Sequence, residues 1–156
     1  MSAPNTVSAG SHRVAIATAR FNHRVTDLML SGCRQALVDA GVDPDNVTVI
    51  AVPGAWELPL ACDQLARSGR FDAVIALGAV IRGETAHFDF ISAECARGLQ
   101  QVSLATRIPV AFGVLTAETG EQALERADPA RKNKGREAAM AALDMIALTR
   151  ELADVG

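Results

Sequence analysis

The sequence has few of the residues that build metal sites and disulfides: three cysteines and three histidines among 156 residues. They are Cys33, Cys62, Cys95, His12, His23 and His87. The cysteines lack Cys-x-x-Cys spacing, and with the histidines they form no familiar structural zinc set. This pattern favours buried free thiols in a reducing compartment.

The sequence also lacks long apolar runs and a basic surplus. Its longest apolar run, Ala73–Ile81, is far shorter than the ~20 residues that a membrane helix needs. Met1–Ser11 has neither the basic start nor the apolar core of a signal peptide. Fifteen basic residues stand against 18 acidic ones, a net charge of -3, whereas nucleic-acid surfaces are normally basic. We therefore expect a cytoplasmic protein that binds neither membranes nor nucleic acid.

The length and the composition indicate one folded domain. Hydrophobic residues make up 49% of the chain and charged residues 21%, which is close to the globular average and excludes a wholly disordered chain. The start is rich in Ser, Ala, Pro and Asn. We therefore expect a flexible tail over residues 1–12 and a single domain over residues 13–156.

Two hydrophobic periods alternate from residue 13 onward. The runs that predict buried strands are Arg13–Ala19, Val47–Val52, Ala73–Ile81 and Pro109–Leu115. The stretches that predict helices are about His23–Ala40, Ala55–Arg67, His87–Thr106, Thr119–Asp128 and Lys134–Ala153. Gly41 stands where a glycine commonly ends a helix, and Thr119-x-x-Gln122 has the spacing of a capping box.

This alternation predicts right-handed crossovers and a parallel sheet that is covered on both faces. The near-continuous apolar strands agree, because strands buried on both sides do not alternate with polar residues. We expect an α/β fold: a three-layer α/β/α sandwich with a four-stranded parallel sheet, flavodoxin-like in shape. The open sheet edges and Ala-rich helices hint at an oligomer.

Ligands of open parallel sheets bind outside the carboxyl ends of the strands. Aromatic, acidic, basic and imidazole groups follow the predicted strands there. They come from Arg20–Asn22, Pro53–Glu57, Arg82–His87, Thr116 and Glu118. Such a rim suits a small, flat, polar substrate.

Gly83-Glu84-Thr85 leads directly into a predicted helix. Free backbone N–H groups and the helix dipole make such a start an anion site, most often for phosphate. The alternative is that Gly83 is an ordinary turn glycine. The chain has neither a Gly-x-Gly-x-x-Gly motif after its first strand nor a P-loop motif, which disfavours dinucleotide and P-loop nucleotide sites.

His87, in the first turn of that helix, is the side chain best suited to move protons at neutral pH. The alternative is a surface or capping histidine. We expect His12, in the tail, and His23, at a helix start, to be solvated.

Each of the other candidates has an ordinary structural interpretation as well. Phe21 and Trp56 could stack on a planar ring or only pack at the rim. Glu57 could accept hydrogen bonds from hydroxyl groups or favour a helix start. Arg126 fits a cation at a helix C-terminus, and lysines 132 and 134 fit a solvated loop. The residues alone thus indicate a phosphate-binding α/β enzyme for small molecules.

Several of these segments together resemble the lumazine synthase family of riboflavin biosynthesis. The most specific match is Gly78–Asp89, which reads Gly-Ala-Val-Ile-Arg-Gly-Glu-Thr-Ala-His-Phe-Asp. The other matching segments are Ala19–Asn22, Val52–Pro59, Phe71–Leu77, Phe112–Thr116, Glu121–Ala127, Asn133–Gly135 and Glu137–Ala139. The resemblance covers about residues 13–150.

The resemblance implies an enzyme, 6,7-dimethyl-8-ribityllumazine synthase, a transferase. Family members condense 5-amino-6-(D-ribitylamino)uracil with 3,4-dihydroxy-2-butanone 4-phosphate to give 6,7-dimethyl-8-ribityllumazine, phosphate and water, the penultimate step of the pathway. No cofactor or metal takes part in the family's reaction.

The resemblance also assigns roles to residues. Phe21 would stack on the pyrimidine, and Trp56 stands in a position that another aromatic often holds, with Ala55 beside it among the substrate-binding residues. Asn22 and Glu57 would hold the ribityl hydroxyls. The uracil edge would be read by the backbone of Ala79, Val80 and Ile81. The phosphate would be bound by Gly83, Glu84, Thr85 and Arg126, and His87 would transfer protons.

Family sites lie between neighbours in a pentameric ring, so Phe112, Arg126 and Lys134 would come from the adjacent subunit. Asp128–Asn133 lacks the glycines of the turn that many capsid-forming members have there. A homopentamer is therefore expected as the basic unit, and whether pentamers assemble further into decamers or a sixty-subunit shell stays open. Two alternatives stay open: a pentamer that binds lumazine or flavin without making it, and another phosphate-using flavodoxin-like enzyme.

Overall fold

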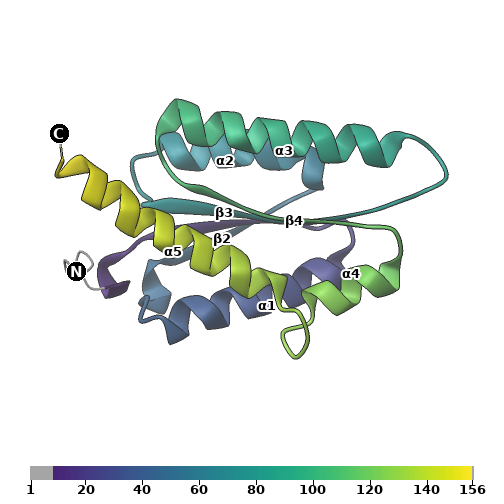
Figure 1. Cartoon of the computed structure of the whole chain (residues 1–156), viewed down its shortest axis with the longest axis horizontal. Helices are drawn as coiled ribbons and strands as arrows, with labels where there is room; N and C mark the ends of the chain where they lie inside the picture. The colour runs from purple at the N-terminus through teal and green to yellow at the C-terminus, as the bar shows by residue number, and fades with distance from the viewer. Residues whose placement is uncertain (1–8, 156) are drawn as a thin grey trace.

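Four parallel strands form the centre of the structure, a computed structural model that describes residues 9–155 (Figure 1). They are β1 (Val14–Ala19), β2 (Val47–Val52), β3 (Ala73–Ile81) and β4 (Val110–Ala117). Their order is β2-β1-β3-β4, and every neighbouring pair is parallel. The carboxyl ends of all four strands therefore meet at one edge of the sheet.

Helices cover both faces of this sheet (Figure 1). The helices α1 (His23–Asp39), α4 (Gly120–Ala127) and α5 (Lys134–Ala153) pack on one face, and α2 (Leu58–Arg67) and α3 (His87–Thr106) pack on the other. Short 3-10 helices occur at η1 (Ala9–Ser11), η2 (Pro44–Asn46) and η3 (Ala55–Glu57). The three-layer α/β/α architecture predicted from the sequence is confirmed.

Burial explains why the inner strands are almost wholly apolar. Every residue of β1 is buried, as are the first seven residues of β3. The side chains of Val14 and Ile16 enter the core under α1 and α5, whereas Ala15 and Ala17 enter the core under α2 and α3. Since each inner strand faces two cores, neither of its faces needs polar side chains.

The element ends differ from the prediction in small ways. The fourth strand runs to Ala117 because its ladder with β3 continues until Ala117 faces Ile81. The second helix starts as 3-10 helix η3 and becomes α-helical at Leu58, with Pro59 in its first turn, where the missing proline N–H costs no helical bond.

Both predicted helix-end signals act in the fold. Gly41, directly after the cap of α1, has a φ of 96°, which glycine adopts easily. Thr119 Oγ1 accepts the N–H of Gln122 at 3.1 Å and so caps α4. The Gln122 side chain reaches one residue further back than in a capping box, because its Oε1 accepts the N–H of Glu118 at 2.9 Å.

The C-terminal part of the predicted tail over residues 1–12 has defined structure. Residues 1–8 lie outside the described part of the chain, but Ala9–Ser11 form η1, and the carbonyl of Gly10 accepts a hydrogen bond from Asn46 Nδ2 at 2.9 Å. His12, expected to be solvated, is only 7% exposed. Residues Ala9–His12 therefore pack against the folded domain. Contacts with distant residues such as Asn46 hold them there.

His12 lies beside two charged groups at the amino edge of the sheet. Arg150 Nη2 lies 3.6 Å from Asp72 Oδ1, and Asp72 Oδ2 accepts the N–H of Arg13 at 2.8 Å. Burial and the nearby Arg150 lower the pKa of His12 below 6.5, although Asp72 opposes this. The fold thus favours the neutral imidazole.

We expect His12 to make the fold less stable in acid. Below pH 6.5 the unfolded chain binds the proton more readily than the fold does, so stability is lost as the pH falls toward the lowered folded pKa. His12→Gln should flatten the pH dependence of the unfolding free energy between about pH 7 and 5. The control, His23→Gln at an exposed site, should not; equal slopes in wild type and His12→Gln would contradict the prediction. Urea titrations provide the measurement.

The first turn of α5 touches the backbone of α1. A Cβ on Gly135 would collide with the carbonyl oxygen of Met29, so the two helices approach closely only because residue 135 has no side chain. Gly135 also directly follows Lys134, so this contact sets the position of that lysine's backbone.

Gly135→Ala is therefore expected to destabilise the fold by about 1–3 kcal/mol or more, as overpacking does. Gly120→Ala is the matched control, because Gly120 also lies in the first turn of a helix and has open space around it. Thermal unfolding of both variants gives the comparison. Equal midpoints would show that the backbone approach is not limiting.

Candidate active site

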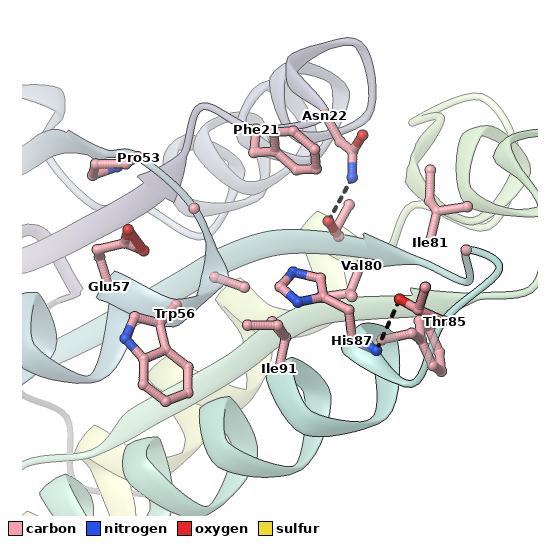
Figure 2. A pocket seen from close by; sticks show the side chains of 15 residues that line it. Phe21, Asn22, Pro53, Trp56, Glu57, Val80, Ile81, Thr85, His87 and Ile91 are labelled. Atoms are coloured by element: carbon pink, nitrogen blue, oxygen red, sulfur yellow. Dashed lines mark hydrogen bonds between the residues drawn. The ribbon is translucent and has the colours of Figure 1, made fainter.

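A pocket of about 840 Å³ lies at the carboxyl ends of β1, β2 and β3 (Figure 2). It is lined by Phe21, Asn22, Pro53, Gly54, Ala55, Trp56, Glu57, Ala79, Val80, Ile81, Gly83, Thr85, His87, Phe88 and Ile91. The strand ends bring these segments together because the sheet is parallel. The lining includes most of the residues that the sequence nominates.

The two aromatic candidates are free to contact a ligand. The exposed fractions of Phe21 and Trp56 are 71% and 60%, which argues against the interpretation that they only pack at the rim. In Figure 2 they come from opposite sides of the pocket, Phe21 after β1 and Trp56 from η3. Exposed rings on two walls can hold a flat ring between them.

Asn22 joins two of the walls. Its backbone is left-handed, with a φ of 62°, and its carbonyl accepts N–H groups from the first turn of α1. Its Nδ2 donates to the carbonyl oxygen of Ala79 at 2.8 Å (Figure 2). The side-chain Oδ1 remains available as an acceptor. Glu57, half-buried at the end of η3, adds a carboxylate to the same pocket.

The loop between β3 and α3 forms the pocket's third wall. Gly83 is not among the glycines with positive φ, and a Cβ there would meet no atom within 4 Å. A strained turn therefore does not account for this glycine. Thr85 Oγ1 accepts the N–H of His87 at 3.3 Å, and Figure 2 shows the His87 imidazole directed into the pocket. Glu84, also nominated, is exposed and does not line the pocket.

Arg82 anchors the base of this loop. Its Nε lies 2.8 Å from Glu118 Oε2, its Nη2 lies 3.6 Å from Asp89 Oδ1, and its guanidinium lies 4.5 Å from the centre of the Phe88 ring. The backbone N–H of Arg82 also donates to Ala117 at 2.9 Å. Arg82 thus joins the loop to the end of β4 and the start of α3.

Three nominated residues lie in a second hollow of about 420 Å³, outside the first pocket. They are Phe112, Arg126 and Lys134. The hollow lies between β4 and the helices α4 and α5, and Phe112 is 51% exposed on its edge strand. Within one chain, these three residues and His87 therefore belong to different sites.

The two cations of this hollow have different partners. Lys134 Nζ forms an ion pair with Glu137 Oε2 at 2.8 Å, whereas Arg126 Nη1 donates to Gln122 Oε1 at 3.3 Å. Both cations are half-buried, while Lys132 is exposed. The solvated-loop interpretation thus fits Lys132 but not Lys134.

Four lining residues were not predicted from the sequence as site residues: Pro53, Gly54, Phe88 and Ile91. The first two belong to the segment after β2 that was already singled out. Phe88 and Ile91 follow His87 along α3, and their helical spacing was the signal that could have placed them on the His87 side.

Metal ligands do not gather in the described part of the chain, where no three His, Cys, Asp or Glu side chains are grouped for an ion. Nor does any helix within residues 9–155 have the length and hydropathy of a membrane span. Cys33, Cys62 and Cys95 are buried, and burial raises their pKa values to about 12, 12 and 11. Such thiols stay protonated and are poor nucleophiles.

Comparison with known proteins identifies relatives of the chain. A sequence model of the 6,7-dimethyl-8-ribityllumazine synthase family matches residues 11–150. The chain is 57% identical over 141 residues to the 6,7-dimethyl-8-ribityllumazine synthase of Edwardsiella ictaluri, and the match covers 90% of each chain. It is 56% identical to that of Sodalis glossinidius over 141 residues, again 90% of each chain. The enzyme of that name from Pectobacterium atrosepticum is 56% identical over 144 residues, 90% of this chain and 91% of the relative.

The fold and the rim pocket define the class: an α/β protein with a pocket of small-molecule size at the carboxyl ends of its parallel strands. The chain belongs to the 6,7-dimethyl-8-ribityllumazine synthase family. The resemblance seen in the sequence is thereby confirmed, and with it the transferase activity in riboflavin biosynthesis.

Proposed function

We propose that this chain condenses 5-amino-6-(D-ribitylamino)uracil with 3,4-dihydroxy-2-butanone 4-phosphate at a site built by two adjacent copies. One copy supplies the pocket with His87, and the next supplies Phe112, Arg126 and Lys134. The observation that carries this proposal is the separation of those residues into two hollows within one chain. The pocket with His87 has no cation from the second hollow, and the second hollow has no imidazole.

In this site the pyrimidine lies between aromatic rings. Phe21 and Trp56 are exposed and line opposite walls, which suits stacking on a planar heterocycle. Backbone groups of Ala79–Ile81 meet the uracil edge, and Asn22 and Glu57 accept hydrogen bonds from the ribityl chain. Polar groups that fix orientation within a largely apolar pocket are typical of small-molecule sites.

The phosphate of the butanone substrate binds at the start of α3. Gly83 leaves open space there, Thr85 supplies a hydroxyl, and the dipole of α3 favours an anion at this helix start. The neighbour's Arg126 adds a positive charge that stabilises phosphate as it departs. The neighbour's Lys134 lies in the same hollow as that arginine.

His87 moves the protons of the reaction. Attack of the amine on the ketone, loss of phosphate and dehydrating ring closure each need a proton transfer, and one imidazole can serve them in turn. Holding both substrates in register supplies much of the remaining acceleration. No step requires a group that the two chains do not provide.

An interface in which each copy both offers a pocket and fills its neighbour's is head-to-tail, and such an interface forms a ring when its rotation closes. We propose a homopentamer. The Asp128–Asn133 loop between Arg126 and Lys134 is tied back by hydrogen bonds to Asp128, and Asn133 caps α5. Light scattering in neutral buffer measures whether such rings assemble further.

The three free buried cysteines fit a reducing compartment, and we propose that the enzyme works in the cytoplasm. A tagged chain followed by cell fractionation tests this location.

Mixing the two substrates with the protein tests turnover: lumazine absorbance should rise as phosphate is released. Binding of lumazine without phosphate release would instead indicate a binding protein. The shared site is tested by assembling His87→Ala and Arg126→Ala chains together. Random assortment around a ring would restore both residues in about one site in four, so the rate at butanone phosphate concentrations well below the wild-type KM should exceed that of either parent. Mixed rings no more active than their parents would overturn the two-chain site.

A further inference from the structure

Arg126 is held by a neutral partner. It lies half-buried in the last turn of α4, and its Nη1 donates to Gln122 Oε1, four residues earlier on the same helix face, at 3.3 Å. No second hydrogen-bond or ion-pair partner for this guanidinium lies within residues 9–155. The remaining N–H groups of Arg126 are thus open toward the second hollow, which this residue lines.

The position of Gln122 is set independently of Arg126. Its Oε1 also accepts the backbone N–H of Glu118 at 2.9 Å, a contact that involves neither Arg126 nor the Thr119 cap. An amide oxygen accepts two hydrogen bonds, and here the backbone supplies the first of them. The oxygen therefore forms a fixed point to which one corner of the guanidinium is attached.

The choice of a neutral partner matters because nearby arginines are paired with carboxylates. Arg82 pairs with Glu118 at 2.8 Å, and Arg131 pairs with Glu125 at 3.4 Å. Arg126 directly follows Glu125 in the sequence, but its side chain binds the Gln122 amide, which leaves its positive charge without a carboxylate partner. A cation that binds a dianionic ligand needs both a fixed position and a positive charge that no carboxylate compensates.

We propose that Gln122 is a positioning residue that orients Arg126 toward the phosphate of the substrate bound by the adjacent copy. The inference rests on the proposed role of Arg126 as a phosphate ligand. With Gln122 in place, the long arginine side chain loses less rotamer freedom when phosphate arrives. The same contact places Glu118 between two parts of the machinery: its carboxylate pairs with Arg82, at the base of the loop before α3, and its N–H fixes Gln122.

Gln122→Met keeps the size and helix preference of the side chain but removes the acceptor. We expect KM for the butanone phosphate to rise about three- to tenfold, as loss of one hydrogen bond implies, while KM for the ribitylaminouracil stays within about twofold. Gln122→Glu restores the acceptor but neutralises Arg126, so KM for the phosphate substrate should rise further. The dissociation constant of inorganic phosphate, measured by calorimetry, should follow the same order.

Thr119→Ala is the control for a merely structural role. It removes the cap of α4 but leaves the Gln122 amide, so it should lower the melting temperature without changing the ratio of the two KM values. If Thr119→Ala changes that ratio as Gln122→Met does, loosening of the helix explains the effect and the proposal is wrong.

A double-mutant cycle separates the positioning role of Gln122 from the phosphate-binding role of Arg126. In the Arg126→Ala background, Gln122→Met should change KM for the phosphate substrate by less than about twofold, because the two residues act as one unit. The positioning role would be overturned if the effects of the two substitutions add, or if Arg126→Ala raises KM while Gln122→Met does not. Either outcome would leave the phosphate role of Arg126 intact. An unchanged KM in Arg126→Ala would overturn that phosphate role itself.

Discussion

His87→Ala is expected to lower kcat by about 10²–10⁴-fold, the usual contribution of general acid–base catalysis, without abolishing turnover. The residual activity reflects the alignment of the two substrates, which this substitution leaves in place. The rate is measured as lumazine absorbance at saturating concentrations of both substrates.

The matched control is His23→Ala. His23 and His87 are both exposed and both begin a helix, α1 and α3, but only His87 lines the pocket. His23→Ala should therefore retain wild-type turnover. An unchanged kcat in His87→Ala would remove this imidazole from the mechanism.

Arg126→Ala is expected to raise KM for the butanone phosphate by about 10- to 100-fold, as loss of a hydrogen bond to a charged group implies. KM for the ribitylaminouracil should change far less, because no phosphate is present in that substrate. Initial rates with each substrate varied in turn separate the two constants.

Arg131→Ala is the matched control on the same side of the fold. Arg131 is exposed, pairs with Glu125 and does not line the second hollow, so its loss should leave both KM values near those of the wild type. Equal losses for the two substrates in Arg126→Ala would contradict a role in phosphate binding.

The layers of the fold were predictable because buried strands and helices have a clear hydrophobic periodicity in the sequence. The strands Val47–Val52 and Ala73–Ile81 and the helices His87–Thr106 and Lys134–Ala153 have the bounds that hydrophobic periodicity indicates. The packing of Ala9–His12 was not predictable, because it depends on contacts with distant residues such as Asn46, which local composition does not reveal.

The sequence predicts which strand ends form the candidate site. It does not predict how the side chains there contact one another. Parallel topology alone brings Phe21, Trp56 and His87 to one edge. The separation of Phe112 and Arg126 from them followed from the resemblance and not from the pattern of residues. The Glu118–Gln122–Arg126 contacts depend on side-chain rotamers and helix register, so no motif indicates them.

The ion pair between Arg150 and Asp72 holds the end of α5 against the start of β3. Asp72 directly precedes β3, and Arg150 belongs to the last turn of α5, so the end of α5 and the start of β1 lie at the amino edge of the sheet (Figure 1). The candidate pocket lies at the opposite, carboxyl edge of the sheet. A domain fused directly before Ala9 or directly after Val155 would therefore start at the edge opposite the candidate pocket, and catalysis should tolerate it.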